Sequence, residues 1–270
     1  MKIAFWGEGE ASGTTSNMLA TASALATAYP YKSVMLQTGK EERSIGQNFS
    51  DAEEENFEVK EGCSYYALKG LDYLISVGRK RVLTKKQVRD NMQSLMGERL
   101  FCLSSGGRML CDYYPKETKQ VLRQVIRLAD LNVDFTFIDC GSRSDTWTKQ
   151  LLKEADLVVV NLKQSPQAFD HFFLQHSNIA DKVIFFISNY QKDSVYNRKN
   201  IHRLYRIAPD QLAVIPYNPE FPYACEKGKL DKYMKGKGSL YQTQMRQYFM
   251  QELAEAVQTL LKNVNDADEK

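Results

Sequence analysis

The fold of this chain is decided by the stretch Ile3-Ala4-Phe5-Trp6-Gly7-Glu8-Gly9-Glu10-Ala11-Ser12-Gly13-Thr14-Thr15-Ser16-Asn17. A short apolar run leads into a glycine-rich turn, and an alanine-rich helical pattern from Thr15 to Ala28 follows it. This order of strand, loop and helix is the context in which backbone N–H groups surround a phosphate. The stretch therefore predicts a phosphate-binding loop of the kind found in α/β nucleotide-binding folds.

The residues of the loop fit the phosphate-loop pattern G-x-x-x-x-G-K-[ST] only in part. Gly13 and Thr15 fit, whereas Thr14 stands at the lysine position and Glu8 at the first glycine. A lysine about 4 Å from a phosphate would contribute roughly 4 kcal/mol of attraction at an effective dielectric constant of about 20. The helix N-terminus alone contributes only about 0.3 to 1 kcal/mol to the binding of an anion. We therefore expect weakened nucleotide binding, unless Glu8 and Glu10 point outward or another cation substitutes. The alternative is a glycine turn that caps a helix and binds no nucleotide.

Strand-like and helix-like segments alternate along the chain. The expected strands are Ile3–Trp6, Ser33–Leu36, Arg99–Leu103, Phe135–Ile138, Leu157–Val160, Val183–Ile187 and Gln211–Ile215. The expected helices between them are Thr15–Ala28, Tyr65–Ser76, Lys85–Leu95, Pro115–Leu131, Thr146–Ala155 and Gln167–His176. This alternation predicts a doubly wound α/β fold, with a mostly parallel sheet and helices on both faces.

The chain is expected to form one domain over residues 1–264, with a frayed tail at 265–270. A last helix from about Leu240 to Val264 carries an apolar face and should pack against the body. That face consists of Met245, Phe249, Leu253, Ala256, Leu260 and Val264.

Composition narrows the class of protein. A net charge of +3 does not demand a nucleic-acid partner, and the basic block at 79–89 is interpreted as a solvated face in preference to a partner-binding patch. Five scattered cysteines without C-x-x-C spacing suit reduced thiols. No apolar run is long enough to span a bilayer and no signal peptide is evident, so we expect a cytoplasmic protein. We assign no metal to the three histidines, since His171 and His176 are five residues apart and off one helical face.

With these motifs in order, the chain resembles the ParA/MinD superfamily of deviant P-loop ATPases over nearly its full length, and within it the CpaE/TadZ group associated with pilus assembly and polar localisation. Members of that group often carry a small residue in place of the loop lysine, as Gly13-Thr14-Thr15-Ser16 does here. Further landmarks are Phe135-Thr136-Phe137-Ile138-Asp139, Phe186-Ile187-Ser188-Asn189-Tyr190 and Ile215-Pro216-Tyr217-Asn218-Pro219.

The resemblance implies a site for ATP or ADP with Mg²⁺. Its nucleotide-binding residues would be Gly9, Ser12, Gly13, Thr14, Thr15, Ser16, Asn189, Pro216 and Tyr217. Thr15 and Asp139 would hold the metal, and the Asn189 amide would contact the adenine edge, because an amide offers a donor and an acceptor together. The alternatives are a turn or helix-capping aspartate at 139 and a turn asparagine at 189.

Departures from the family pattern bear on catalysis. The family lysine that reaches across a dimer corresponds here to Gly9 or its neighbour, and Thr38 stands where relatives carry an aspartate. We therefore expect little or no ATPase activity, with Lys40, Arg43 or Arg143 as candidate replacement cations.

The resemblance implies a localisation or assembly factor for a pilus or secretion machine, with protein partners in an envelope-associated assembly. A homodimer is compatible with it, as is recruitment through partners to the inner face of the membrane or a cell pole. The alternatives are an active ATPase that uses substitute cations and an interaction scaffold that binds no nucleotide.

Overall fold

The computed structural model describes residues 1–38, 44–50, 57–60, 64–67, 69–104, 116–176, 182–236 and 243–268. The main sheet has eight strands in the order β10-β9-β8-β1-β7-β2-β6-β5. Their bounds are β1 Lys2–Gly7, β2 Ser33–Gln37, β5 Gln93–Ser94, β6 Leu100–Leu103, β7 Phe135–Asp139, β8 Leu157–Lys163, β9 Val183–Tyr190 and β10 Leu212–Pro216. The two edge strands, β10 and β5, come from segments far apart in the sequence.

The sheet is parallel except at one edge. Every neighbouring pair from β10 to β6 is parallel, and the two-residue β5 pairs antiparallel with β6. The central strands are buried on both faces, which is why they read as continuous apolar runs in the sequence. The predicted doubly wound, mostly parallel α/β fold is confirmed.

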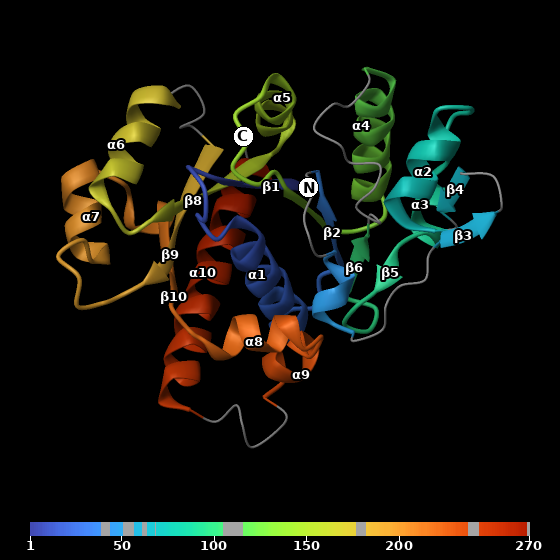
Figure 1. The fold of residues 1–270 in the computed structure, drawn as a ribbon. Helices are drawn as coiled ribbons and strands as arrows, with labels where there is room; N and C mark the ends of the chain where they lie inside the picture. Colours follow the sequence, from blue (N-terminus) through green and yellow to red (C-terminus); the bar gives the residue numbers. More distant parts are fainter. Residues whose placement is uncertain are drawn as a thin grey trace.

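Helices cover both faces of the sheet, as Figure 1 shows. The helices that pack on one face are α2 Gly70–Gly78, α3 Lys85–Asp90, α4 Lys116–Asp130, α5 Thr146–Glu154, α6 Pro166–Gln175 and α7 Arg198–Tyr205. Those on the other face are α1 Thr14–Ala28, α8 Glu220–Glu226, α9 Leu230–Met234 and α10 Gln244–Asp268. Single 3₁₀ turns lie at Gly46–Asn48 and Pro209–Gln211. Two apolar layers, one on each side of the sheet, therefore form the core.

Helix α10 packs against α1 and β10 as its apolar face predicts. Phe249, Leu253 and Leu260 are buried, and each contributes on the order of 1.5 to 3 kcal/mol. Met245 is an exception, because its side chain is 48% exposed near the start of the helix. The helix continues to Asp268, beyond the predicted end at Val264. None of the helices in the described ranges is long and apolar enough to cross a membrane.

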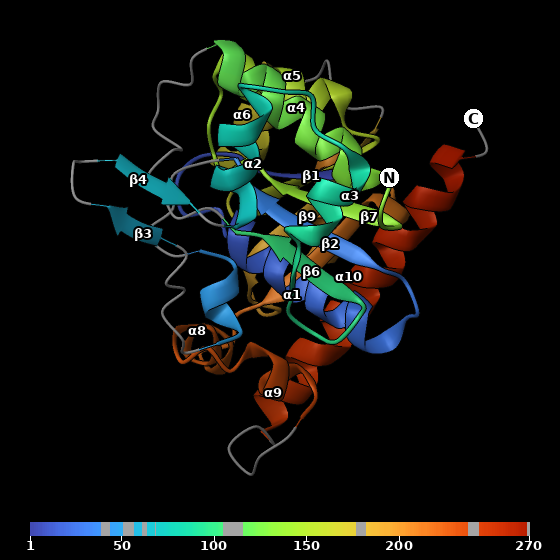
Figure 2. The same cartoon turned by 90° about the vertical axis from the view of Figure 1, so that its right-hand side faces the viewer.

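The segment between β2 and α2 differs from the sequence prediction. A separate two-stranded antiparallel sheet, β3 Phe57–Lys60 and β4 Ser64–Ala67, lies beside the main sheet in Figure 2. The predicted helix Tyr65–Ser76 is therefore wrong in its first turn, because tyrosines favour strands and Gly70 has a left-handed φ of 79° at the start of α2. The predicted helix Lys85–Leu95 likewise ends at Asp90, and Gln93–Ser94 joins the sheet edge.

Candidate functional site

The loop between β1 and α1 is anchored at its entrance to the neighbouring strands. The Gly7 N–H donates to the Gly141 carbonyl over 2.8 Å, and the Glu8 N–H donates to the Asn161 carbonyl over 3.1 Å. A Cβ at Gly7 would lie 1.8 Å from the Ser12 Oγ, so the returning arm of the loop packs directly on this glycine. The loop is therefore a compact turn whose shape depends on Gly7 having no side chain.

Backbone N–H groups of this loop are available to a ligand. Gly13 is the N-cap of α1 and has a left-handed φ of 76°, which turns the chain from the loop into the helix. Among the described residues, no acceptor is found for the N–H groups of residues 13 to 16. A cavity of about 280 Å³ is lined by Ala11, Ser12, Gly13, Thr14, Thr15, Ser16, Gly141 and Ser142. Free N–H groups beside a cavity at a helix N-terminus are the arrangement that binds phosphate.

Thr14, at the position of the usual lysine, turns into the loop. It is buried, and its Oγ1 lies 3.0 Å from the Ser12 Oγ. A Cβ at Gly7 would be 2.3 Å from the same Oγ1, which places the hydroxyl inside the turn. The side chain thus fills the loop and brings no positive charge to the cavity.

Glu8 and Glu10, the two acids of the loop, do not block it. Glu8 is paired with His171 at 2.6 Å and His176 at 3.3 Å, both from the α6 region, and Glu10 is exposed. Burial lowers the pKa of His176, which opposes the effect of the nearby Glu8 carboxylate. The Glu8 carboxylate thus points to the α6 region, and neither acid lines the cavity beside the loop.

A buried polar network supports the loop from below. Asn17 on α1 donates through Nδ2 to the Asn161 Oδ1 and to the Ser188 Oγ, each over 2.8 Å. The Ser188 hydroxyl in turn donates to the Ser12 carbonyl, and the Asn161 amide donates to the Trp6 carbonyl over 3.1 Å. The loop is therefore fixed to β1, β8 and β9 at once. These asparagines cannot be recognised from the sequence, because they become neighbours only through the strand order.

Asn17→Ala is expected to lower the free energy of unfolding by about 1 to 3 kcal/mol, since it leaves buried polar atoms of Asn161 and Ser188 without their donor. Ser16→Ala, one residue earlier and exposed, should change it by less than about 0.5 kcal/mol. Urea unfolding of both variants measures the difference. Equal effects would show that the network does not hold the loop.

Thr15 and Asp139, the two predicted metal ligands, lie in direct contact. The Thr15 hydroxyl donates to the Asp139 Oδ2 over 2.6 Å, and the Gly141 N–H donates to Oδ1 over 2.9 Å. Burial raises the pKa of Asp139 above its ordinary value of 3.8, while the bonds from Thr15 and Gly141 and the charge of Arg143 lower it in part. A hydroxyl and a carboxylate side by side are the oxygen ligands that Mg²⁺ prefers, so the pair fits this ion.

The groups around the end of β2 are used in structural contacts. The Thr38 hydroxyl donates to the Asp139 carbonyl over 2.8 Å. Arg143 donates to the Thr38 carbonyl over 2.7 Å and lies close enough to Asp139 to lower its pKa. Of the proposed replacement cations, Arg143 is thus near the site, whereas Lys40 and Arg43 fall outside the described residues.

The predicted base-contacting residues lie at the ends of β9 and β10. Asn189 has a left-handed φ of 50° and is exposed, Pro216 pairs with Tyr190, and Tyr217 is 54% exposed. Ser188, which precedes Asn189, is bonded to the loop through Ser12. These residues share the carboxyl edge of the sheet with the loop, where α/β folds bind ligands. Gly9, the remaining predicted residue, is exposed with φ at 77° and lies outside the cavity lining.

Comparison of the sequence with known proteins finds no matching family model. No curated protein matches it either.

Solved structures are similar along almost the whole chain. A plasmid partition protein from Borrelia burgdorferi B31 bound to AMPPNP has a TM-score of 0.67 at 11% identity, covering 97% of this chain and 98% of that one. MinD from Pyrococcus horikoshii OT3 with Mg-ADP has a TM-score of 0.65 at 14% identity and covers 96% of each chain. A ParA family ATPase from Chlorobium tepidum TLS has a TM-score of 0.64 at 13% identity, and the match covers 92% of this chain and 98% of that one. At these identities the likeness shows the fold, so the chain has the α/β fold of P-loop NTPases.

Proposed function

We propose that this chain is a ParA/MinD-like protein that binds ATP or ADP with Mg²⁺ weakly, at the loop between β1 and α1, and hydrolyses ATP little or not at all. The observation that carries the proposal is a loop with free N–H groups around a cavity of about 280 Å³, in which Thr14 replaces the usual lysine. The backbone part of a phosphate site is thus kept while its positive side chain is absent.

The described residues have distinct roles in this proposal. The N–H groups around Gly13 bind the phosphates, and Thr15 and Asp139 hold Mg²⁺ once their mutual hydrogen bond opens. Asn189, Pro216 and Tyr217 contact the base at the neighbouring strand ends. Binding of Mg²⁺ would favour the ionised carboxylate of Asp139 over its protonated form, because a nearby cation stabilises the negative charge.

The side chains near the proposed phosphate site, Thr38 and Arg143, are the reason that we expect slow hydrolysis. Phosphoryl transfer requires positioned water and cations on the developing charge. Thr38 carries no carboxylate to orient water, and its hydroxyl already donates to the Asp139 carbonyl. Arg143 lowers the pKa of Asp139 through its charge, and its guanidinium donates to the Thr38 carbonyl. This position of Arg143 favours, as a second candidate function, an ATPase in which that guanidinium replaces the lysine.

The biological role we propose is that of a localisation or assembly factor of the CpaE/TadZ kind, in which nucleotide stabilises or switches a surface that binds partner proteins. The proposal rests on the order of the motifs and on the departures at Thr14 and Thr38. A homodimer would bring two such surfaces together.

Calorimetry with ATP and Mg²⁺, followed by a phosphate-release assay, tests the biochemical part. We expect saturable binding up to millimolar ATP and phosphate release no faster than in Asp139→Ala. Absence of heat and of a thermal shift at millimolar ATP would contradict nucleotide binding. Turnover well above the Asp139→Ala value that disappears in Arg143→Met would contradict inactivity and favour the active ATPase.

A further inference from the structure

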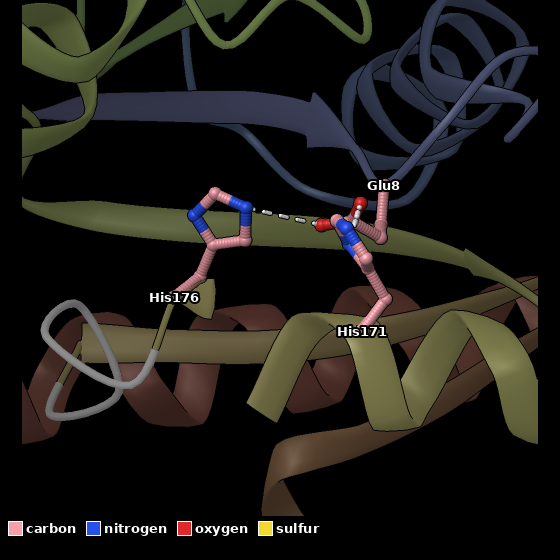
Figure 3. Close-up of side chains that lie close together, drawn as sticks. All are labelled: Glu8, His171 and His176. Carbon is pink, nitrogen blue, oxygen red and sulfur yellow. Dashed lines mark ion pairs between the residues drawn. The ribbon is translucent and has the colours of Figure 1, made fainter. Parts of the chain in front are cut away.

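A second cluster of metal-ligating side chains lies beside the loop, apart from Thr15 and Asp139. Glu8 extends from the end of β1 toward the end of α6, where His171 and His176 converge on its carboxylate (Figure 3). One ligand atom of each residue lies within 4.8 Å of the other two. The five-residue spacing of the histidines excluded such a pair on one helical face. His176 nevertheless reaches the cluster because it is the C-cap of α6, with φ −129° and ψ 21°, and has left the helix.

The three side chains are held in place by their surroundings. The Glu8 N–H is bonded to the Asn161 carbonyl, and its side chain is 9% exposed. The ring of His176 packs edge-on against Trp6 at 4.7 Å between centroids and is 16% exposed. His171 is 59% exposed, which leaves a route from solvent to the carboxylate. A site with two fixed ligands and one open side can take up an ion without unfolding.

The hydrogen bonds within the cluster are incomplete. The Glu8 Oε2 is buried and has no well-aligned hydrogen-bond donor among the described residues, although the His176 Nε2 is 3.3 Å away. A buried carboxylate oxygen without a donor is unfavourable. A cation placed between the carboxylate and the two imidazoles would satisfy this oxygen.

We propose that Glu8, His171 and His176 form a binding site for a divalent transition metal of the Zn²⁺ type. Two imidazoles and one carboxylate suit Zn²⁺ and its neighbours in the transition series, whereas Mg²⁺ and Ca²⁺ prefer all-oxygen ligands. Three protein ligands leave a coordination position for water or an external group, as in zinc sites that are not purely structural.

An ion at this site would join the phosphate loop to α6. Glu8 is the first residue after β1, while His171 and His176 belong to α6 and its C-cap, in the connection between β8 and β9. Bound metal would add positive charge beside a loop that has lost its lysine. Binding of the metal would thus change the charge next to the loop and tie the loop to α6, whether or not nucleotide is bound.

Titration of the full chain with Zn²⁺, without nucleotide, tests the proposal, and Co²⁺ serves as a spectroscopic probe. We expect one equivalent to bind, with visible Co²⁺ absorption of a four- or five-coordinate site containing nitrogen. His171→Gln and His176→Gln should each weaken binding by at least about 100-fold. His202→Gln is the matched control, because His202 is the remaining histidine of the chain and lies on α7. It should leave binding unchanged.

Thermal melting in the absence of metal shows whether each variant is folded. The Glu8→Gln variant removes the carboxylate ligand of the proposed site while it keeps both histidines. Unchanged Zn²⁺ affinity in the His171→Gln/His176→Gln double variant would overturn the proposal. Displacement of Co²⁺ by millimolar Mg²⁺ would also overturn it, since it would show a site for hard cations. Because nucleotide is absent, these results do not depend on the proposed ATP site.

Discussion

Thr14→Lys is expected to raise the affinity of the chain for Mg²⁺-ATP by about 100-fold, a gain of roughly 2.7 kcal/mol. The loop already presents free N–H groups beside a cavity, and position 14 follows Gly13 at the start of α1. A lysine there places a charge near the terminal phosphates, where an ion pair at about 4 Å is worth roughly 4 kcal/mol before desolvation is subtracted. Calorimetric titration of wild type and variant measures the gain.

The control for this prediction is Thr14→Met, which has a side chain of comparable length without charge. Both variants must leave the turn that Thr14 occupies beside Ser12 and Gly7, so both lose the same packing. We expect no gain in affinity for the methionine variant. If lysine and methionine behave alike, the missing charge is not what limits binding at this loop.

Asp139→Asn is expected to stabilise the nucleotide-free protein by on the order of 1 kcal/mol at neutral pH. The carboxyl is 2% exposed, and burial raises its pKa, so its charged form is unfavourable in the folded state. An asparagine keeps both contacts, since its oxygen can accept from the Gly141 N–H and its amide can donate to the Thr15 hydroxyl. Urea unfolding at neutral pH measures the change.

The same variant should alter the pH dependence of stability. Because the folded-state pKa of Asp139 lies above the ordinary 3.8, the folded protein binds this proton more tightly than the unfolded chain. The free energy of unfolding of wild type therefore falls as the pH rises from about 3.8 through the folded-state pKa, and this component is absent from the variant. The variant's advantage should thus grow from acid to neutral pH. A variant that is less stable than wild type at neutral pH would contradict this account.

Asp139→Asn should also separate metal binding from phosphate binding. We expect the Mg²⁺-dependent part of ATP affinity to disappear, while the part supplied by the loop N–H groups remains, because those groups lie on residues 13 to 16 and not on Asp139. Titrations with and without Mg²⁺ distinguish the two parts. Mg²⁺ dependence that persists unchanged in the variant would place the metal elsewhere.

Local patterns in the sequence are sufficient to predict the seven parallel strands of the main sheet and the turn between β1 and α1. Runs such as Leu157–Val160 and Val183–Ile187 lie in the centre of a sheet covered on both faces, so apolar content marks them directly. Gly13 and Thr15 lie at the start of α1 and Asp139 at the end of β7, positions that the neighbouring sequence patterns predict. The contact between Thr15 and Asp139 follows from β1 and β7 being adjacent.

Contacts that depend on strand order or on a local break in helix geometry could not be predicted. Asn17 meets Asn161 and Ser188 because β8 and β9 lie next to β1, an order that no single segment specifies. His176 joins His171 because the chain leaves helical geometry at the C-cap of α6, which a helical periodicity cannot show. The β3–β4 hairpin is missed although Tyr65 and Tyr66 are of a residue type that favours strands.

The most direct test of the central claim is a crystal structure of the chain with ATP and Mg²⁺. Density for a phosphate group should lie on the N–H groups around Gly13, with Mg²⁺ between Thr15 and Asp139 and their direct hydrogen bond opened. The Thr14 side chain should stay inside the loop, away from the phosphates. A loop that remains as it is, with Thr15 still bonded to Asp139 and no nucleotide above Gly13 at millimolar ATP, would contradict the claim that this turn is a nucleotide site.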